Sequence, residues 1–259
     1  MSKILLVTGG ASGIGAAVAR IAAERGFSVA INYRSRREQA ESLVSELRSL
    51  GSRAVAIEAD VAEPNQIQHL YARVKQDLGV PDAVLNSAGI ATSGLRVEDA
   101  TPAELTRLLH VNVLGVMLSC GEAARTMSTK NGGSGGVVIN VSSMAATIGG
   151  RPGNSHYAAS KAAVDAFSVG FAKEVAAEGI RVVSVRPGFT ITDMTKDRLE
   201  DAAFRQVIAE TIPLGRPARV EEVAAPIAWL LSNEASFITG TCLDISGGGF
   251  AIASAPRQG

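Results

Sequence analysis

The sequence predicts a doubly wound α/β fold, with one mostly parallel sheet of about seven strands and helices on both of its faces. Two observations predict this fold. Short β-branched runs that are apolar at their centres recur along the chain, as expected of strands covered on both faces. Between them lie stretches of Ala, Leu, Glu, Arg and Gln at helical spacing, which are long enough for crossover helices.

The strands are expected in the seven most apolar runs. These runs cover residues 3–8, 28–33, 53–58, 82–87, 135–143, 181–187 and 241–245. The low-complexity segment Asn131–Gly136 is expected to form a loop before the fifth strand. Because strand and helix signals alternate from end to end, residues 1–259 are expected to form a single domain. Residues 188–219 are the longest interval without a strand signal, and we expect a lid-like excursion there.

The composition gives no indication of nucleic acid or of an anionic membrane as partner, since 25 basic residues balance 25 acidic ones. No segment reaches the ~20 consecutive apolar residues that a membrane helix needs. The apolar run Ile4–Val7 is too short for a secretory signal. We therefore expect a soluble, cytoplasmic protein.

Cysteines and histidines indicate neither a disulfide framework nor a metal site. Cys120 and Cys242 lie far apart with no paired spacing, and both are predicted to be small buried groups. His69, His110 and His156 share no metal-ligand spacing with carboxylates or thiols. No bound metal is expected.

Candidate chemistry begins where the first predicted strand ends, in the turn Thr8–Gly15. Its glycines are spaced Gly-x-x-x-Gly-x-Gly, which lets backbone N–H groups approach a pyrophosphate at the start of the following helix. The alternative is a structural turn without a ligand. The buried strand before the turn and the Ala-rich helix after it favour dinucleotide binding.

The end of the second strand, Asn32-Tyr33-Arg34-Ser35, indicates which dinucleotide is bound. An acidic residue at this point would hold a free ribose 2′-hydroxyl, whereas an arginine accommodates a 2′-phosphate. Arg34 therefore predicts NADP(H), while Ser35 and Asn32 leave NAD(H) possible. The competing interpretation is that Arg34 and Arg36 are solvated loop charges.

Tyr157 and Lys161 lie four residues apart and share one helical face. The ammonium charge is expected to lower the pKa of the phenol from its reference value near 10. Tyr71 and Lys75 have the same spacing, but no strand-end serine precedes them, so we interpret that pair as a solvated helix face.

In these motifs the chain resembles the short-chain dehydrogenase/reductase superfamily, in its single-domain branch with a Rossmann-type fold. The resemblance extends over essentially the whole chain. It is carried by TGGASGIG, Asp60-Val61, NSAG at residues 86–89, Asn112, INVSS, YAASK and RPGFTIT. NSAG replaces the usual NNAG of the family.

The resemblance implies four catalytic residues. Tyr157 would be the general acid or base, and Lys161 would lower its pKa and bind the nicotinamide ribose. Ser143 would hydrogen-bond the substrate oxygen, although it lies one residue farther from Tyr157 than is commonest, and Ser142 lies farther still. Asn112 would hold a water that links Lys161 to solvent.

The resemblance also implies the residues that contact the cofactor. They are Gly9, Ser12, Gly13, Ile14 and Gly15 at the phosphates, Tyr33, Arg34 and Ser35 at the ribose phosphate, Asp60 and Val61 at the adenine, Asn86, Ala88 and Gly89 at the adenosine ribose, and Tyr157, Lys161, Pro187, Gly188 and Thr192 around the nicotinamide.

The function expected from these residues is an NADPH-dependent carbonyl reductase, reversible as a secondary-alcohol dehydrogenase. A 3-oxoacyl thioester reductase, a glucose-type sugar dehydrogenase and a steroid or xenobiotic ketone reductase remain open, as does a non-catalytic cofactor-binding regulator. The substrate is expected over Ser143, against Met144, Ile148, Pro152, Asn154, Phe189 and Met194.

The resemblance further implies a homotetramer. Its subunits would join through two long helices at about residues 102–128 and 156–178. The apolar tail Phe250–Ala255 is expected at a second interface.

Overall fold

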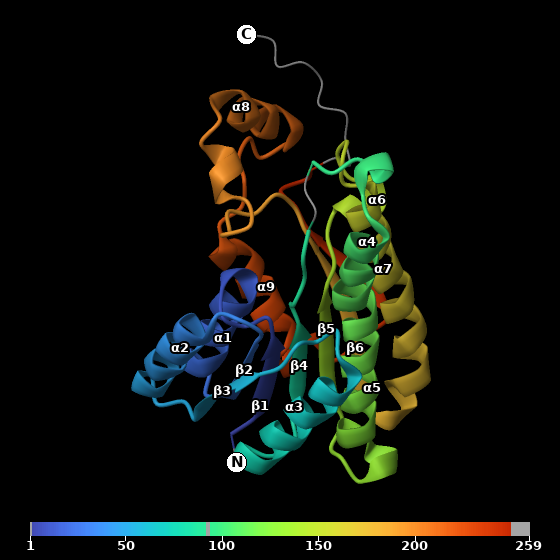
Figure 1. Ribbon diagram of the computed structural model, residues 1–259. Helices are drawn as coiled ribbons and strands as arrows, with labels where there is room; N and C mark the ends of the chain where they lie inside the picture. Colours follow the sequence, from blue (N-terminus) through green and yellow to red (C-terminus); the bar gives the residue numbers. More distant parts are fainter. Residues whose placement is uncertain (1, 92–93, 250–259) are drawn as a thin grey trace.

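The computed structural model describes residues 2–91 and 94–249. Its centre is a sheet of seven parallel strands in the order β3-β2-β1-β4-β5-β6-β7 (Figure 1). The strands are β1 (Ile4–Thr8), β2 (Ser28–Tyr33), β3 (Ala54–Glu58), β4 (Ala83–Asn86), β5 (Gly136–Val141), β6 (Ile180–Pro187) and β7 (Thr241–Ile245). The predicted seven-stranded, Rossmann-type sheet is confirmed, and each strand lies within two residues of its predicted run at either end. The proposed interface tail at residues 250–255 lies outside the described residues.

Helices cover both faces of the sheet. One face carries α1 (Gly13–Glu24), α2 (Arg37–Ser49) and α9 (Val220–Leu230). The other face carries α3 (Pro64–Asp77), α5 (Gly115–Met127) and α7 (Ser155–Val175). The shorter α4 (Pro102–Leu109) leads through a π-helical segment (His110–Leu114) into α5.

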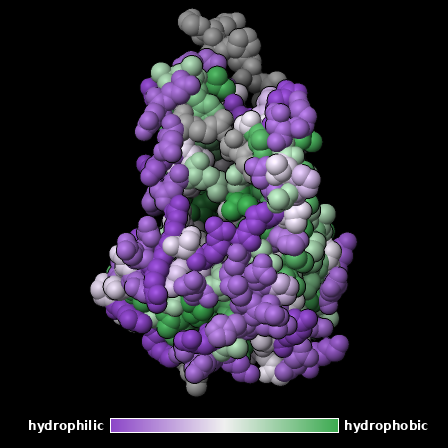
Figure 2. Space-filling view, in the orientation of Figure 1, coloured by the Kyte–Doolittle hydropathy of each residue, from purple (hydrophilic) through white to green (hydrophobic). Residues whose placement is uncertain are grey.

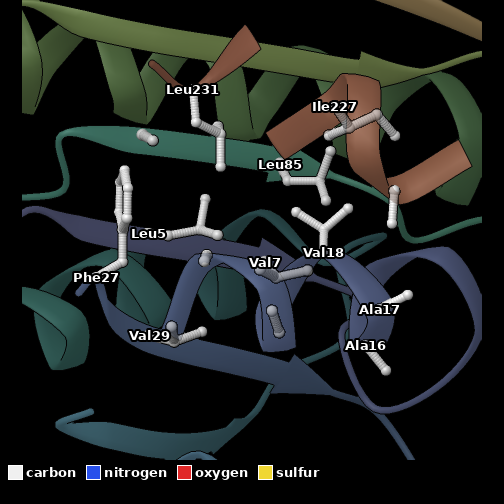
Figure 3. Packing of buried hydrophobic residues seen from close by; sticks show 14 of the residues in the cluster. Leu5, Val7, Ala16, Ala17, Val18, Phe27, Val29, Leu85, Ile227 and Leu231 are labelled. Carbon is white, nitrogen blue, oxygen red and sulfur yellow. The ribbon is translucent and has the colours of Figure 1, made fainter. Parts of the chain in front are cut away.

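Two hydrophobic cores follow from the alternation of side chains along the strands. In β1, Leu5 and Val7 face α1 and α9, whereas Ile4 and Leu6 face α3 and α5. Figure 3 shows Val18 of α1 packed between β1 and Ile227 of α9. β1 and β4 are neighbouring central strands that are buried on both faces. Their close packing fixes the positions of their carboxyl ends, which lie side by side.

The excursion after β6 stands away from the sheet (Figure 1). It contains a short 3₁₀ turn (Lys196–Leu199) and α8 (Ala202–Thr211). Its two ends are joined by backbone hydrogen bonds from Ile191 N to Ala218 O and from Ala218 N to Phe189 O, both 2.9 Å long. The excursion therefore has a fixed stem and a projecting helix.

Two expectations about buried groups are wrong. Tyr71 is 2% exposed rather than solvated, because its ring lies on the apolar face of α3 and its hydroxyl donates to Ser119 O at 2.8 Å. Lys75 is exposed, as predicted. Cys120 is fully buried, but Cys242 is half-buried because β7 is an edge strand.

Within residues 2–91 and 94–249, no helix combines the length and the apolar character that a membrane crossing requires.

Candidate active site

A cavity of about 710 Å³ opens at the carboxyl ends of the parallel strands. Figure 2 shows the hollow between the part of the molecule that carries α8 and the part that carries α4 and the short helix α6 (Ala145–Ile148). In doubly wound sheets this edge is where ligands bind. Most of the predicted site residues line the cavity, namely Gly9, Ser12, Gly13, Ile14, Tyr33, Arg34, Ser35, Asp60, Val61, Ala88, Gly89, Ser143, Tyr157, Lys161, Pro187, Gly188 and Thr192.

The glycine-rich turn is shaped by close backbone contacts. Gly9 has φ +61°, and a Cβ on it would lie 2.6 Å from Ala88 Cα. Gly13, at φ +56°, leaves the cavity side of the turn open, with Thr192 as its nearest neighbour. Gly15 does not line the cavity, since it packs against the turn beneath it. The turn fits the pyrophosphate cradle that the sequence predicts.

Two polar side chains fix the adenosine end of the cavity. Asn32 joins the turn to the end of β3, because its Oδ1 accepts from Gly9 N at 3.3 Å and its Nδ2 donates to Ala59 O at 2.9 Å. Asp60 accepts from Arg107 Nη2 at 2.7 Å. Burial on its own would raise the pKa of Asp60. The hydrogen bonds from the Ala62 N–H and the Arg107 guanidinium outweigh burial and hold this pKa below its usual range.

The two arginines after β2 differ in their partners. Arg36 donates to Ser12 Oγ and to Asp193 Oδ2, both at 2.8 Å. Arg34 is exposed, lines the cavity and forms no ion pair with any of the described residues. Arg34 is therefore available to a phosphate, whereas Arg36 already joins the glycine-rich turn to the excursion.

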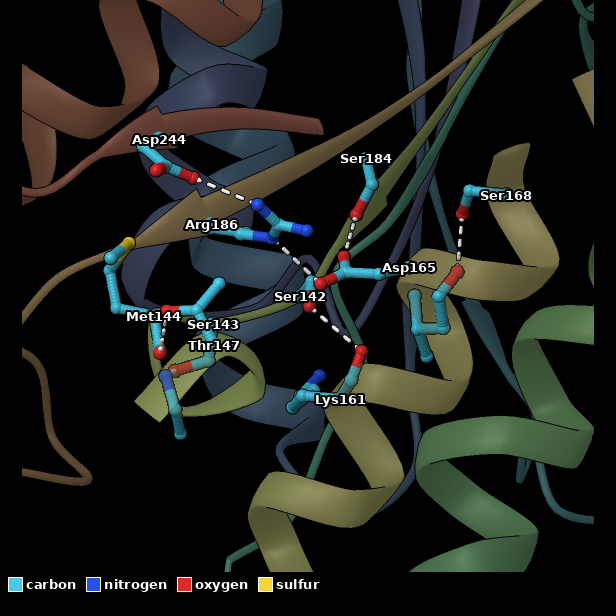
Figure 4. A network of polar contacts seen from close by, with 12 residues as sticks. Ser142, Ser143, Met144, Thr147, Lys161, Asp165, Ser168, Ser184, Arg186 and Asp244 are labelled. Carbon is cyan, nitrogen blue, oxygen red and sulfur yellow. Dashed lines mark hydrogen bonds and ion pairs between the residues drawn. The ribbon is translucent and has the colours of Figure 1, made fainter. Parts of the chain in front are cut away.

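Tyr157 and Ser143 meet at the inner end of the cavity. The Ser143 hydroxyl lies beside the Tyr157 phenol and accepts from Ala145 N at 3.1 Å. Ser142 points elsewhere, because its Oγ donates to Lys161 O at 3.0 Å (Figure 4). The geometry therefore brings Ser143, rather than Ser142, to the tyrosine hydroxyl.

Lys161 lies one helical turn from Tyr157, with its Nζ 5.8 Å from the centre of the tyrosine ring. The Nζ donates to Val141 O at 2.8 Å, and the side chain is buried. Burial lowers the pKa of Lys161 to about 8, against the opposing charge of Asp165.

The expected direction of the tyrosine pKa is wrong for the protein on its own. Burial raises the pKa of Tyr157, and the neighbouring Ser143 hydroxyl only partly opposes this rise. The physical reason is that desolvation disfavours the phenolate. Lys161 directs its ammonium group to the Val141 carbonyl, and its Nζ lies over the Tyr157 ring.

Asn112 and Asn86 lie behind the cavity, and neither of them lines it. Asn112 lies in the π-helical segment and clamps the backbone of Ile90, with Oδ1 accepting from Ile90 N and Nδ2 donating to Ile90 O, both at 2.9 Å. Asn86 donates to Asn140 Oδ1 at 2.8 Å and joins the ends of β4 and β5. Both asparagines support the cavity wall from behind.

The substrate end of the cavity is mostly apolar. Met144, Ile148, Asn154, Phe189 and Met194 line it as predicted. Pro152 does not line it, because it lies on the exposed side of its loop.

An aromatic contact ties this end to the excursion. The rings of Phe189 and Phe204 meet edge to face at 5.4 Å, and the Arg151 guanidinium lies 5.6 Å from the Phe204 ring. The Phe204 ring thus joins α8 to the cavity wall.

Sequence reasoning missed Arg107, Asp193 and Asp165. The first two are separated from their partners by 47 and 157 residues, so no local spacing announces them. Asp165 did carry a signal, because it follows Lys161 by four residues and so shares its helical face.

The chain is similar to known oxidoreductases over nearly its whole length. The family model that matches, over residues 9–249, is described as enoyl-(acyl carrier protein) reductase. The uncharacterized oxidoreductase YgfF of Escherichia coli (strain K12) is 41% identical over 95% of this chain and 99% of the relative. The 3-oxoacyl-[acyl-carrier-protein] reductase FabG of Staphylococcus aureus (strain Mu50 / ATCC 700699) is 35% identical over 96% of this chain and 98% of the relative.

Solved structures show the same fold. A short-chain dehydrogenase from Burkholderia cenocepacia J2315, solved in complex with NADP, is 36% identical over 95% of this chain and 96% of that one, with a TM-score of 0.87. The motifs, the fold and the matches cover nearly the same residues. The chain is therefore a member of the short-chain dehydrogenase/reductase family.

Proposed function

We propose that this oxidoreductase uses NADPH to reduce the carbonyl group of a small molecule, and that Tyr157 supplies the proton. The observation that carries the proposal is the hydroxyl pair of Tyr157 and Ser143 on the cavity wall, one helical turn from Lys161. A nicotinamide dinucleotide bound in the cavity would supply the hydride.

The chain's own residues handle the oxygen and the proton. Ser143 and Tyr157 hydrogen-bond the carbonyl oxygen from one side, which fixes its position. Tyr157 then gives its phenolic proton to that oxygen as negative charge develops on it. The raised pKa of Tyr157 keeps the phenol protonated and ready to donate. Lys161 stabilises the phenolate that remains.

The cradle fits a phosphorylated dinucleotide. The positive φ angles at Gly9 and Gly13 bring backbone to the pyrophosphate position, and Arg34 offers a cation that no described residue pairs with, where a 2′-phosphate would lie. The NADP complex of the Burkholderia cenocepacia relative supports this choice. NAD remains a second, weaker cofactor in this proposal.

Among substrates, a 3-oxoacyl thioester is the second candidate, because the Staphylococcus aureus relative is named for that activity. The apolar wall of Met144, Ile148 and Phe189 suits an acyl chain as well as a simple ketone. A sugar dehydrogenase fits this wall less well. A non-catalytic regulator has no chemical need for Ser143, Tyr157 and Lys161 together.

We further propose that the chain acts as one domain in a cytoplasmic homotetramer. The α4–α5 and α7 helices would form the interface, and residues 188–219 would close over the substrate. Sedimentation of the purified protein as a monomer would refute the assembly.

Turnover tests the catalytic proposal. NADPH oxidation with a panel of ketones and 3-oxoacyl thioesters is expected in the wild type and lost in Tyr157→Phe, with cofactor binding retained. Tyr71→Phe is the matched control, since it makes the same change at the same Tyr-x-x-x-Lys spacing, outside the cavity. Undiminished turnover in Tyr157→Phe would contradict the proposal.

Titration with both dinucleotides tests the cofactor. NADPH is expected to bind more tightly than NADH, and Arg34→Ala is expected to abolish that preference. The control is Arg37→Ala, because Arg37 is exposed, pairs with Glu41 and does not line the cavity. An unchanged preference in Arg34→Ala would assign the 2′-phosphate to another residue.

A further inference from the structure

The helix face that carries Tyr157 and Lys161 continues into a second buried charge. Asp165 lies one turn beyond Lys161 on α7, and the two residues are 6% and 4% exposed. Tyr157, Lys161 and Asp165 thus form a row at steps of four residues. A buried carboxylate is costly unless it is paired, so its partners indicate its role.

Both carboxylate oxygens of Asp165 are held by β6 (Figure 4). Ser184 Oγ donates to Oδ1 at 2.6 Å, and Arg186 Nε donates to Oδ2 at 2.7 Å. Arg186 also reaches Asp244 of β7, at 3.3 Å. The carboxylate is therefore fixed in orientation between the guanidinium of β6 and the helix that carries Lys161.

The surroundings of Lys161 explain why this carboxylate matters. The Lys161 ammonium is buried, and its Nζ hydrogen bond is to a neutral group, the Val141 carbonyl. Gly89, which lies beside the Lys161 Nζ, is also neutral. The titratable groups on β6 and β7, Arg186 and the Cys242 thiol, face Asp165.

The charge of Asp165 acts on Lys161 against its burial. Burial alone favours the neutral amine, and the Asp165 carboxylate raises the pKa that burial has lowered. A neutral Lys161 would give the phenolate of Tyr157 no electrostatic support.

We propose that Asp165 is a positioning residue for the proton transfer: its fixed carboxylate keeps the Lys161 ammonium charged beside Tyr157. This inference rests on the proposed function of Tyr157 and Lys161. In the reaction one O–H bond of Tyr157 breaks and its proton passes to the substrate oxygen. Lys161 and Asp165 exchange no proton and act through charge alone.

The test measures the ionisation of Lys161 directly. The protein is labelled with ¹³C-lysine, and the Cε signals of its six lysines are followed by NMR against pH, with Lys161→Met assigning the signal. The wild-type midpoint is expected at about 8. In Asp165→Asn it is expected to fall by about one pH unit, the lower end of the effect of a neighbouring opposite charge.

Matched variants separate the charge from the packing. Ser184→Ala and Asp244→Asn remove neighbouring hydrogen bonds and keep the Asp165 charge, so their midpoints should match the wild type. The exchange Asp165→Ser with Ser184→Asp moves the carboxylate to the facing strand and should restore the midpoint toward the wild type. If Asp165→Asn does not fold, the same substitution is compared within an Arg186→Gln background, which leaves no unpaired guanidinium.

Turnover gives the second readout. As the pH rises, kcat/KM for carbonyl reduction is expected to decline in both proteins, and in Asp165→Asn the decline should begin at a lower pH than in the wild type. The KM for NADPH at low pH should be unchanged. A Lys161 midpoint that coincides in the wild type and Asp165→Asn overturns the inference. That result is distinct from failure of the proposed function, which would appear as turnover in Tyr157→Phe.

Discussion

Arg36 and Asp193 form an ion pair of 2.8 Å that joins the segment after β2 to the excursion after β6. Arg36 also donates to Ser12 Oγ in the glycine-rich turn at 2.8 Å. All three residues line the cavity. The pair is about half exposed, so it contributes at most about 1 kcal/mol to global stability, and its effect is on the excursion.

Asp193→Asn is therefore expected to loosen the excursion and leave the fold intact. Trypsin should cleave at Lys196 and Arg205 several times faster than in the wild type, while the urea midpoint changes little. The control is Glu41→Gln, which breaks the exposed Arg37–Glu41 pair on α2. Equal cleavage rates in Asp193→Asn and the wild type would show that this ion pair does not hold the excursion.

The strands could be predicted from the sequence because each is a short apolar run, and the central ones are buried on both faces. Runs such as Ile4–Thr8 and Ser28–Tyr33 are apolar at their centres and end in turn residues, so a local pattern defines them. The Gly-rich turn and the Tyr157–Lys161 pair are local for the same reason. Both line the cavity, and each follows directly or closely on the end of a buried strand.

What the sequence could not predict depends on contacts between distant segments. Arg34 and Arg36 look alike in sequence, yet Arg36 alone meets Asp193, which lies 157 residues away. Tyr71 and Tyr157 share one motif, and burial against α5 separates their roles. Asn112 is turned toward Ile90 by the π-helical segment, whose backbone pattern leaves no signature in composition.

Gly9 and Gly26 both have positive φ angles, but only at Gly9 would an added Cβ also collide with a neighbour. Gly26 has φ +84°, and a Cβ added to it would meet no atom within 4 Å, so Gly26→Ala should cost about 1 kcal/mol of backbone strain alone. Gly9→Ala adds a collision with Ala88, 2.6 Å away, and should be several kcal/mol worse. Urea unfolding measures both. Equal losses in the two variants would mean that the turn relaxes freely around Gly9.

The two thiols are expected to differ in reactivity. Burial raises the pKa of the Cys120 thiol to about 12, and the residue is 0% exposed. Burial also raises the pKa of Cys242, but this residue is half-buried on the edge strand. Iodoacetamide should therefore label Cys242 slowly in the native protein and Cys120 only after unfolding in urea, as read by peptide mass spectrometry. Equal native labelling of both would contradict the packing around Cys120.

Lys161 should make stability depend on pH in a defined window. Its pKa is lowered from 10.5 to about 8, so between these values the unfolded chain binds more protons than the folded one. Above a pH equal to the unfolded pKa of 10.5, Lys161 is neutral in both states and its burial costs no charge. As the pH falls to the folded pKa of about 8, the free energy of unfolding decreases by on the order of 3 kcal/mol. The free energy of unfolding of Lys161→Met should therefore exceed that of the wild type most at about pH 7, and the excess should shrink toward about pH 10. Urea unfolding at both pH values measures the difference, with Lys75→Met as the exposed control. A difference between Lys161→Met and the wild type that is constant across this window would mean that Lys161 is not desolvated as the structure shows.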